Sequence, residues 1–225
     1  MPTQPLRSVL PVPATAYRPS SLLPRRAERP SQEPVAAVFL DRDGVINENR
    51  DDHVKSWSEF CFLPGTFLAL RRLRRAGLPV FVITNQAVIS RGLVAPAVLD
   101  DIHYRMQQQI RQNGGLINDI RHCPHDSHEA CGCRKPQPGM LFDLASHWNI
   151  DLGRSYLVGD AWTDMAAGHA AGCRCILVKT GRGTEHARLP EARQYPAEHI
   201  APNLLGAVAW LLHQEHAHTQ ALALG

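Results

Sequence analysis

The stretch that decides the fold is VAAVFLDRDG, residues 35–44, in which a short apolar run ends at Asp41 and Asp43. Its β-branched and aromatic content favours a buried strand over a helix. Gly44 lets the chain turn sharply directly after the two aspartates. We therefore expect a strand that carries both carboxylates at its carboxyl end.

Strands that end in polar residues recur along the chain. The run 80–83 stops at Thr84 and Asn85, and the run 156–158 stops at Gly159 and Asp160. The intervening segments have helical periodicity. Helices are predicted over 65–76, 96–112, 138–148, 163–171 and 204–213, and strands over 35–40, 80–83, 117–122, 156–158 and 175–178. This alternation implies an α/β fold with a mostly parallel sheet covered by helices on both faces.

The polar strand ends should meet in one crevice, because ligands bind beyond the carboxyl ends of the strands in an open parallel sheet. There, Asp41 can attack phosphorus as a nucleophile. Asp43 can protonate the leaving oxygen and then deprotonate the hydrolytic water. An ordinary capped turn is the alternative for this pair of aspartates.

Carboxylates that face a phosphate repel it and each other, so a divalent cation is expected at the site. Its predicted ligands are Asp41, Asp43 and Asp160. Asp164 lies one helical turn after Asp160, where it can support them. Oxygen ligands beside a phosphate favour Mg²⁺. The alternative for Asp164 is a contact with the helix dipole.

The charge of the transferring phosphoryl group also needs donors. Thr84 and Asn85 offer a hydroxyl, an amide and backbone groups, and Lys135 offers a cation. Taken singly, Thr84 and Asn85 are better explained as a polar turn, and Lys135 as a surface lysine. Their combination with the aspartates favours phosphoryl transfer.

A second constellation lies at about residues 122–136 and has the pattern Cys-x-His-x5-Cys-x-Cys. Its four soft ligands match a closed tetrahedral Zn²⁺ site, which is structural because no position remains for a catalytic water. The predicted ligands are Cys123, His125, Cys131 and Cys133. Nearby His122 and His128 are weaker alternatives.

The other cysteines, Cys61, Cys173 and Cys175, are expected to be buried as small apolar residues.

A zinc ribbon that binds a partner or a nucleic acid is a function of another class that such a cluster allows. The formal charge of +3 resides in residues 1–34, where five arginines face two glutamates, so the rest of the chain is neutral. Binding to a phosphate backbone needs a basic domain surface, so we expect no nucleic-acid partner. Arg134 and Lys135 follow the last cysteine directly, and bound zinc would hold both cations over the phosphate pocket.

Composition indicates a soluble globular protein, with 225 residues, 44% hydrophobic and 20% charged. No apolar run approaches the ~18 residues of a membrane span. Eight prolines in residues 1–34 predict a disordered extension before a catalytic domain over 35–225. An organelle transit peptide is the alternative for this arginine-rich start. Without a secretory pattern, we expect a cytoplasmic protein with reduced cysteines.

The sequence resembles the haloacid dehalogenase superfamily of phosphohydrolases in four motifs: Asp41-Arg42-Asp43-Gly44, Thr84-Asn85-Gln86, Lys135, and Gly159-Asp160 with Asp164. The zinc-containing branch, which includes heptose-bisphosphate and histidinol phosphatases, is similar in Cys123-Pro124-His125 and Cys131-Gly132-Cys133-Arg134-Lys135-Pro136. This resemblance covers residues 35–215. It implies a Rossmann-like core, a minimal cap, and a monomer that acts on a small phosphorylated metabolite.

The resemblance also implies roles for single residues. Asp41 is the nucleophile, Asp43 the acid and base, and Thr84 and Lys135 the phosphoryl stabilisers. Implied substrate contacts are Arg42, Asn85, Gln86, Arg91 and Arg134. Ser90-Arg91-Gly92 and Pro138-Gly139-Met140 are similar to the heptose type, which removes the 7-phosphate of a heptose 1,7-bisphosphate. Histidinol phosphate is the alternative substrate.

Three departures bear on substrate identity. Ala161 stands where the heptose type often has a lysine, and Ala87-Val88 replaces the usual Ser-Gly pair. The segment 48–54 is one residue longer than the usual loop, with His53 at a position that is often aromatic. These departures leave the expected phosphatase chemistry intact.

Overall fold

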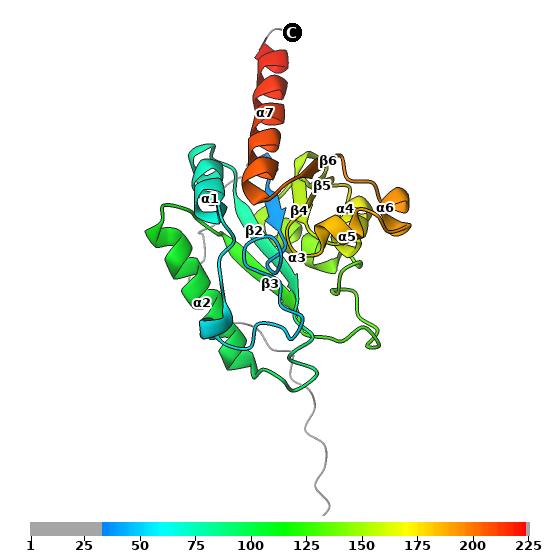
Figure 1. The fold of residues 1–225 in the computed structure, drawn as a ribbon. Helices are drawn as coiled ribbons and strands as arrows, with labels where there is room; N and C mark the ends of the chain where they lie inside the picture. The colour runs from blue at the N-terminus through cyan, green and yellow to red at the C-terminus, as the bar shows by residue number, and fades with distance from the viewer. Residues whose placement is uncertain (1–32, 224–225) are drawn as a thin grey trace, which may run out of the picture. The chain divides into compact units, whose positions relative to one another are not determined.

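The computed structural model describes residues 33–223, so the predicted extension lies outside the described residues except for its last two positions. Six parallel strands form one sheet in the order β3-β2-β1-β4-β5-β6 (Figure 1). They are β1 (Val38–Leu40), β2 (Val80–Asn85), β3 (Asp119–Cys123), β4 (Tyr156–Gly159), β5 (Arg174–Val178) and β6 (His199–Ala201). The predicted α/β fold with a parallel sheet is confirmed.

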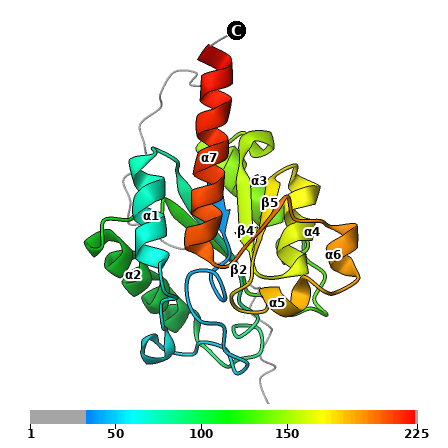
Figure 2. The same ribbon diagram turned by 45° about the horizontal axis from the view of Figure 1, so that its top comes forward.

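Helices cover both faces of this sheet. The α-helices are α1 (Thr66–Arg75), α2 (Pro96–Gln112), α3 (Gly139–Trp148), α4 (Trp162–Ala171), α5 (Gly183–His186), α6 (Glu191–Gln194) and α7 (Leu204–Ala223). Buried side chains of α1, α2 and α7 pack on one face, and those of α3 and α4 pack on the other. Helices α1 and α7 lie side by side (Figure 2).

Strand β1 shows why the core has two halves. Successive side chains of a strand point to opposite faces of the sheet. Val38 and Leu40 therefore join the cluster under α1 and α7, whereas Phe39 joins the cluster under α3. All three side chains have no exposed surface, and such burial makes the run 38–40 uniformly apolar.

The strand order reverses at β1, because the chain first builds β2 and β3 on one side and then β4, β5 and β6 on the other. Leu40 lies opposite Val158 in the register between β1 and β4. The backbone N–H of Asp41 donates to the carbonyl of Val158 at 3.0 Å. Asp41 and Asp160 therefore leave adjacent strands at the switch point, where open α/β sheets bind ligands.

The cap is minimal, as expected. The connection between β1 and α1, residues 41–65, holds only the short 3-10 turn η1 (Trp57–Glu59). A second 3-10 turn, η2 (Leu152–Arg154), precedes β4. Sequence reasoning missed both turns together with β6, α5 and α6, which are all too short to show a hydrophobic period.

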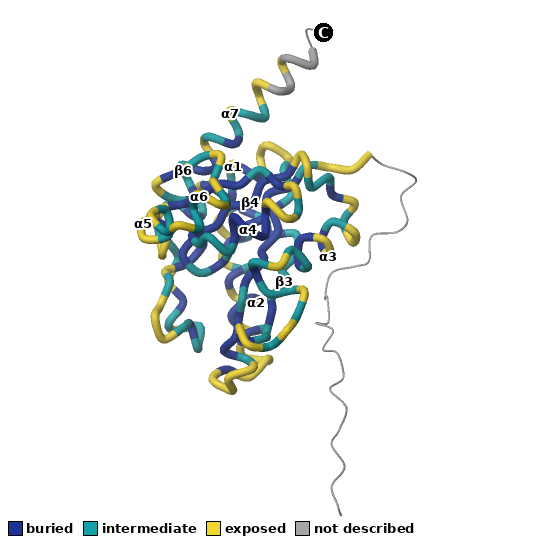
Figure 3. Tube along the Cα trace, turned by 90° about the vertical axis from the view of Figure 1, so that its right-hand side faces the viewer, coloured by how far each residue is buried: buried dark blue, intermediate teal, exposed yellow. Residues whose placement is uncertain are grey.

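Helix α7 is ten residues longer than the sequence predicts, because it continues to Ala223 instead of ending at His213. Among the residues of α7 whose burial is described, Leu211 is the last buried one. Figure 3 shows the helix running from the buried core out beyond the body of the domain. Within the described residues, no helix has both the length and the apolar content needed to cross a membrane.

Candidate active site

Asp41 and Lys135 form the centre of the site. Oδ1 of Asp41 accepts from the backbone N–H of Arg42 at 2.7 Å and lies 2.8 Å from Nζ of Lys135. The lysine side chain is 3% exposed and also lies 2.6 Å from Oδ1 of Asp164. Burial alone would lower the pKa of Lys135, but the charges of Asp164 and Asp41 raise it above its ordinary value. The lysine is therefore a fixed cation between two carboxylates.

Asp41, Asp160 and Asp164 form what we call the carboxylate group, because one ligand oxygen from each lies within 4.8 Å of the others. Burial and the charges of Asp41 and Asp164 raise the pKa of Asp160 to about 8. Burial also raises the pKa of Asp41 to about 6, although Lys135 opposes the rise. Lys135 is one cation against three carboxylates, and hard oxygen donors of this kind fit Mg²⁺.

Two glycines cradle the Asp160 carboxylate. Gly44 and Gly181 have φ of 83° and 55°, and a Cβ on either would lie 2.1 Å from Oδ2 of Asp160. The same oxygen accepts from the backbone N–H of Arg182 at 2.8 Å. The loop after β5 thus fixes Asp160 against the turn after β1, and only residues without a side chain fit this approach.

Asp43 has a separate set of partners. Its carboxylate accepts from Nη2 of Arg42 at 2.8 Å, from Nδ2 of Asn47 at 2.8 Å and from Nε2 of Gln86 at 2.9 Å. Burial alone would raise the pKa of Asp43, but the Arg42 charge and these hydrogen bonds lower it below its ordinary value. The Asp43 carboxylate lies outside the carboxylate group, and its place among the Mg²⁺ ligands stays a prediction.

Arg42 does not line an open surface, although the sequence predicts it as a substrate contact. Its side chain has no exposed area. The Arg42 guanidinium donates to Asp43, and its Nη1 also donates to Nε2 of His103 on α2 at 3.1 Å. Because an arginine has only donors, Nε2 of His103 must accept, and the imidazole is neutral. Burial and the Arg42 charge hold the pKa of His103 well below its ordinary value.

The polar residues at and just after the end of β2 form hydrogen bonds with other residues of the site. Asn85 exchanges two hydrogen bonds of 3.0 Å with the backbone of Lys135, one from its amide and one to its carbonyl. Gln86 donates to Oγ1 of Thr84 at 2.9 Å as well as to Asp43. Asn85 therefore faces Lys135, and Gln86 faces Asp43 and Thr84. Sequence reasoning missed Asn47 and His103, since a single polar residue beyond a motif gives no local signal.

The cysteine cluster comprises Cys123 at the end of β3 and, in the connection from β3 to α3, His125, Cys131 and Cys133. Cys133 Sγ lies 3.1 Å from Cys123 Sγ, 3.6 Å from Cys131 Sγ and 3.4 Å from Nδ1 of His125. Zn–S bonds of about 2.3 Å place tetrahedral ligands about 3.8 Å apart. The arrangement fits Zn²⁺, and the predicted alternatives His122 and His128 are outside the cluster.

The loop of the cysteine cluster is tied to its surroundings through arginines. Nη1 of Arg134 donates to the carbonyl of His125 at 2.9 Å. Arg91 forms a two-armed contact with Asp126, at 2.6 and 2.8 Å. Both arginines were predicted as substrate contacts, and in the structure both contact this loop, while Nη1 of Arg91 also lies 3.3 Å from Nε2 of His53.

The three remaining cysteines differ in how far they are buried. Cys173 and Cys175 are buried, as expected. Cys61 is exposed, so its predicted burial is wrong. It lies between the aromatic side chains of Phe60 and Phe62, and these turn toward the core side of the segment.

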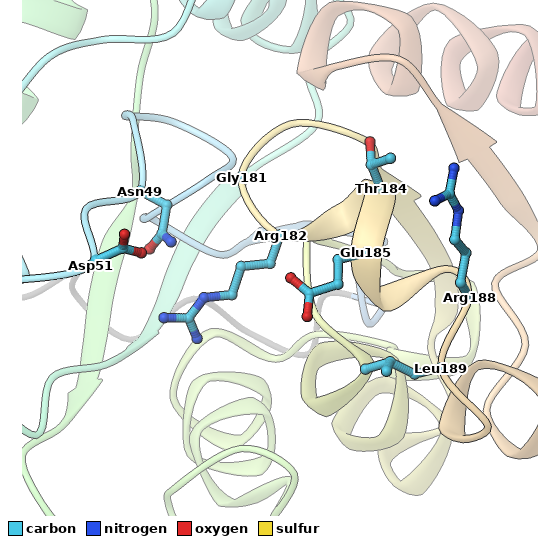
Figure 4. Close-up of a pocket in the computed structure, with 8 residues that line it drawn as sticks. All are labelled: Asn49, Asp51, Gly181, Arg182, Thr184, Glu185, Arg188 and Leu189. Carbon is cyan, nitrogen blue, oxygen red and sulfur yellow. The ribbon is translucent and has the colours of Figure 1, made fainter.

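A cavity of about 600 Å³ opens beside the loop that holds Asp160. Its lining comes from the segment after β1 and from the region of α5 (Figure 4), and comprises Asn49, Asp51, Gly181, Arg182, Thr184, Glu185, Arg188 and Leu189. Asn49 and Asp51 belong to the segment 48–54, which the sequence analysis links to substrate identity, whereas the residues near α5 were not singled out, because two distant loops join only in the fold.

In a comparison with known families, a HAD-hydrolase-like family model matches residues 132–207. This span includes the end of the cysteine cluster, Lys135, and both Asp160 and Asp164.

Curated relatives match over more of the chain. A D-glycero-beta-D-manno-heptose-1,7-bisphosphate 7-phosphatase of Pseudomonas aeruginosa is 42% identical over 146 residues, which is 65% of this chain and 82% of the relative. A D-glycero-alpha-D-manno-heptose-1,7-bisphosphate 7-phosphatase of Mycobacterium tuberculosis is 39% identical over 149 residues, or 64% of this chain and 78% of the relative.

Among solved structures, a D,D-heptose 1,7-bisphosphate phosphatase of B. bronchiseptica matches with a TM-score of 0.74 and 37% identity. The match covers 80% of this chain and 99% of that one, whose crystal structure contains magnesium and phosphate.

Proposed function

The chain belongs to the haloacid dehalogenase-like hydrolases, in the branch of the heptose-bisphosphate phosphatases, and on this premise we propose that it removes the 7-phosphate of D-glycero-D-manno-heptose 1,7-bisphosphate. It is a phosphoric monoester hydrolase. The observation that carries the proposal is the contact of Lys135 with both Asp41 and Asp164 at the switch point of the sheet.

Asp41 is the nucleophile of the proposed reaction. Its Oδ1 is engaged by Lys135 and the Arg42 backbone, and the described residues supply no hydrogen bond to Oδ2, so attack is assigned to Oδ2. A bond forms from Oδ2 to phosphorus, and the bond from phosphorus to the ester oxygen breaks. Asp43 gives its proton to the departing sugar oxygen.

Hydrolysis of the aspartyl-phosphate reverses the role of Asp43. Its carboxylate takes a proton from water, the water oxygen attacks phosphorus, and the bond to Asp41 breaks to release inorganic phosphate. The low pKa of Asp43 in the free protein suits this base step. Bound phosphate next to Asp43 raises the pKa of its carboxyl and thereby favours the acid step.

Mg²⁺ is proposed to bind the carboxylate group, where it neutralises the substrate phosphate and charge that develops on the phosphoryl oxygens. Asp41 and Asp160 are the proposed carboxylate ligands. Asp164 accepts from the backbone N–H of Ala161 at 3.0 Å and lies against Lys135, so it supports the site by holding the lysine.

Zn²⁺ is proposed to bind the cysteine cluster as a structural ion. Lys135 follows Cys133 by two residues, and Asn85 holds the lysine backbone from the other side. When this loop is ordered, it therefore holds the ammonium group of Lys135 in contact with Asp41. The zinc-ribbon module without catalysis is not favoured, because the cluster lies in a loop of the phosphatase fold rather than in a unit of its own.

Arg42, Asn85 and Gln86 are proposed as positioning residues instead of substrate contacts. Arg42 and Gln86 orient the carboxylate of Asp43, and Asn85 orients Lys135. Arg91 and Arg134 are proposed to affect substrate binding indirectly, because they fix the shape of the loop of the cysteine cluster. Thr84 is proposed to face the phosphoryl group.

The relatives differ in the anomer that their names specify, one beta and one alpha, so both anomers belong in the assay. The test is Mg²⁺-dependent phosphate release from each heptose 1,7-bisphosphate and from histidinol phosphate, with the Asp41→Asn protein as the blank. A kcat/KM advantage of about 100-fold for a heptose bisphosphate is expected, or about 2.7 kcal/mol in transition-state binding. An equal advantage for histidinol phosphate would overturn the substrate assignment.

We further propose that the protein is a cytoplasmic monomer with no nucleic-acid partner. Support comes from the thiolate ligands of the cysteine cluster, which persist in a reducing compartment. Light scattering after gel filtration tests the monomer, and a dimer mass would contradict it.

A further inference from the structure

The segment after β5, residues 179–186, contacts both strand ends that carry the carboxylates of the site. Oγ1 of Thr180 donates to the carbonyl of Gly44, in the turn after β1, at 2.6 Å. The backbone N–H of Arg182 donates to Oδ2 of Asp160 at 2.8 Å. One short segment therefore fixes the turn after β1 and the carboxylate that follows β4 relative to each other.

A third contact from this segment reaches the start of α4. Nδ1 of His186, the last residue of α5, accepts from the backbone N–H of Trp162, the first residue of α4, at 3.2 Å. A backbone N–H can only donate, so Nδ1 carries no proton and the imidazole is neutral. Burial and the charge of Arg182 lower the pKa of His186 below its ordinary value, which favours this neutral form. His186 is therefore a fixed acceptor at the first turn of α4.

Helix α4 needs an acceptor from elsewhere in the fold, because its own N-cap residue supplies none. The first N–H groups of a helix have no partner within the helix, and a serine, threonine, aspartate or asparagine at the N-cap usually supplies an oxygen. The N-cap of α4 is Ala161, whose methyl group cannot accept. Asp164 accepts from the backbone N–H of Ala161, and His186 accepts from that of Trp162. The imidazole thus does the work of a missing cap.

The start of α4 matters for the site because it lies between two members of the carboxylate group. Asp160 directly precedes the N-cap, and Asp164 lies in the first turn of α4, where it contacts Nζ of Lys135 at 2.6 Å. A shift of this turn would change the spacing of both carboxylates. His186 itself does not belong to the carboxylate group, so its effect on the group passes through the backbone of α4.

His186 also contributes to packing, because it lines an apolar cavity of about 140 Å³ together with Met165 and Tyr195. Loss of packing alone would lower the melting temperature. Loss of the Nδ1 acceptor would instead act on the start of α4. Two substitutions separate these contributions: leucine fills space without an acceptor, whereas the amide oxygen of asparagine lies where Nδ1 lies and fills less space.

We propose that His186 is a positioning residue for the Mg²⁺ site: its Nδ1 holds the start of α4, so that Asp160 and Asp164 keep the spacing that the ion needs. The inference rests on the proposed function and adds to it a residue outside the four motifs. Because His186 acts through the backbone, its loss should change Mg²⁺ affinity and kcat, and should leave the KM of the sugar phosphate nearly unchanged.

The test measures Mg²⁺ binding to the full-length protein by titration calorimetry, which needs no substrate, and steady-state kinetics with heptose 1,7-bisphosphate. His186→Leu should weaken Mg²⁺ binding by about 5- to 10-fold, in line with the loss of one helix cap. Its kcat should fall by about fivefold. His186→Asn should bind Mg²⁺ within about twofold of wild type and recover most of kcat, although it packs less well.

The control is His213→Ala, at an exposed histidine of α7, which should match wild type in both readings. Melting temperatures of all variants verify folding. The inference is overturned if His186→Leu binds Mg²⁺ as tightly as wild type, or if His186→Asn is as weak as His186→Leu. A wild type that binds Mg²⁺ but releases no phosphate would refute the proposed function alone, because the binding comparison would still decide the role of His186.

Discussion

The carboxylate group and the cysteine cluster are each suited to one metal ion, yet they differ in what holds their ligands. Asp160 and Asp164 are buried, and their positions follow from β4, α4 and the glycine cradle. The cysteine cluster lies in a connection where only Cys123 belongs to a strand, and its sulfur atoms contact mainly one another.

This difference separates the consequences of losing each ion. Without Mg²⁺ the carboxylates remain in place, because sheet and helix packing hold them, and the cost falls on catalysis. Without Zn²⁺ the loop has little core of its own, so the cost falls first on local order. Disorder in this loop then displaces Lys135 from Asp41, because Lys135 belongs to the loop and contacts the carboxylate group.

The largest effect is expected for Lys135→Met, which removes the joining cation. Activity should fall by about 1,000-fold, in line with the loss of one preorganised charge at a transition state. Stability should also fall, since the buried carboxylates of Asp41 and Asp164 lose their partner. Steady-state kinetics and thermal melting measure both changes. The exposed Lys179→Met is the control, and a rate for Lys135→Met within about tenfold of wild type would contradict the account.

Next in size is Cys133→Ser, which removes one ligand of the cysteine cluster. Zinc content should drop, the melting temperature should fall, and activity should decrease by about 100-fold because Lys135 is no longer fixed. Elemental analysis, calorimetry and kinetics of one preparation provide the three readings. Cys61→Ser, at an exposed cysteine outside the cluster, should change none of them. Full activity of a zinc-free Cys133→Ser protein would break the proposed link between the two regions.

A smaller effect is expected at His103, which holds Asp43 only through Arg42. His103→Leu leaves a buried donor of Arg42 without its acceptor and should lower kcat by about tenfold. KM should change little, because His103 does not face the open site. His103→Gln offers an amide oxygen and should restore most of the rate. Equal losses in the Leu and Gln variants would show that the imidazole has another role.

The smallest effect concerns the pH dependence of Mg²⁺ binding. The raised pKa of Asp160, about 8, means that the free protein holds a proton that the metal must displace. The apparent affinity should therefore rise with pH and level off above about pH 8, by less than tenfold between pH 7 and 8. Titration calorimetry in buffers of different ionisation enthalpy measures the released proton. A constant affinity from pH 6 to 9 would show that the carboxylate group is already fully ionised.

Sequence patterns predicted the fold where elements were long and periodic. Helix α2 begins and ends at the predicted residues, Pro96 and Gln112, because its apolar period is bounded by a proline at the start. The second half of α7 could not be found in this way, because residues 214–223 show no apolar period in the sequence. Strand β6, with three residues, was also too short to be recognised.

The candidate site was predictable where neighbours in space are also neighbours in sequence. The cysteine cluster and the turn from Asp41 to Gly44 are of this kind. The contacts between site residues that are distant in sequence were not predictable. Asn85 meets Lys135, and Gly181 meets Asp160, only after the sheet forms. For the same reason Arg42 resembled a substrate contact, whereas the fold buries it against His103.

The most direct test of the central claim is to trap the covalent intermediate. Wild-type protein with Mg²⁺ and heptose 1,7-bisphosphate is quenched in acid during turnover, digested and analysed by mass spectrometry. The account predicts a phosphoryl group on the peptide that carries Asp41, and none in Asp41→Asn, which should also release no phosphate. Phosphate release by the Asp41→Asn protein at the wild-type rate, or a phosphoryl group on a different residue, would contradict it.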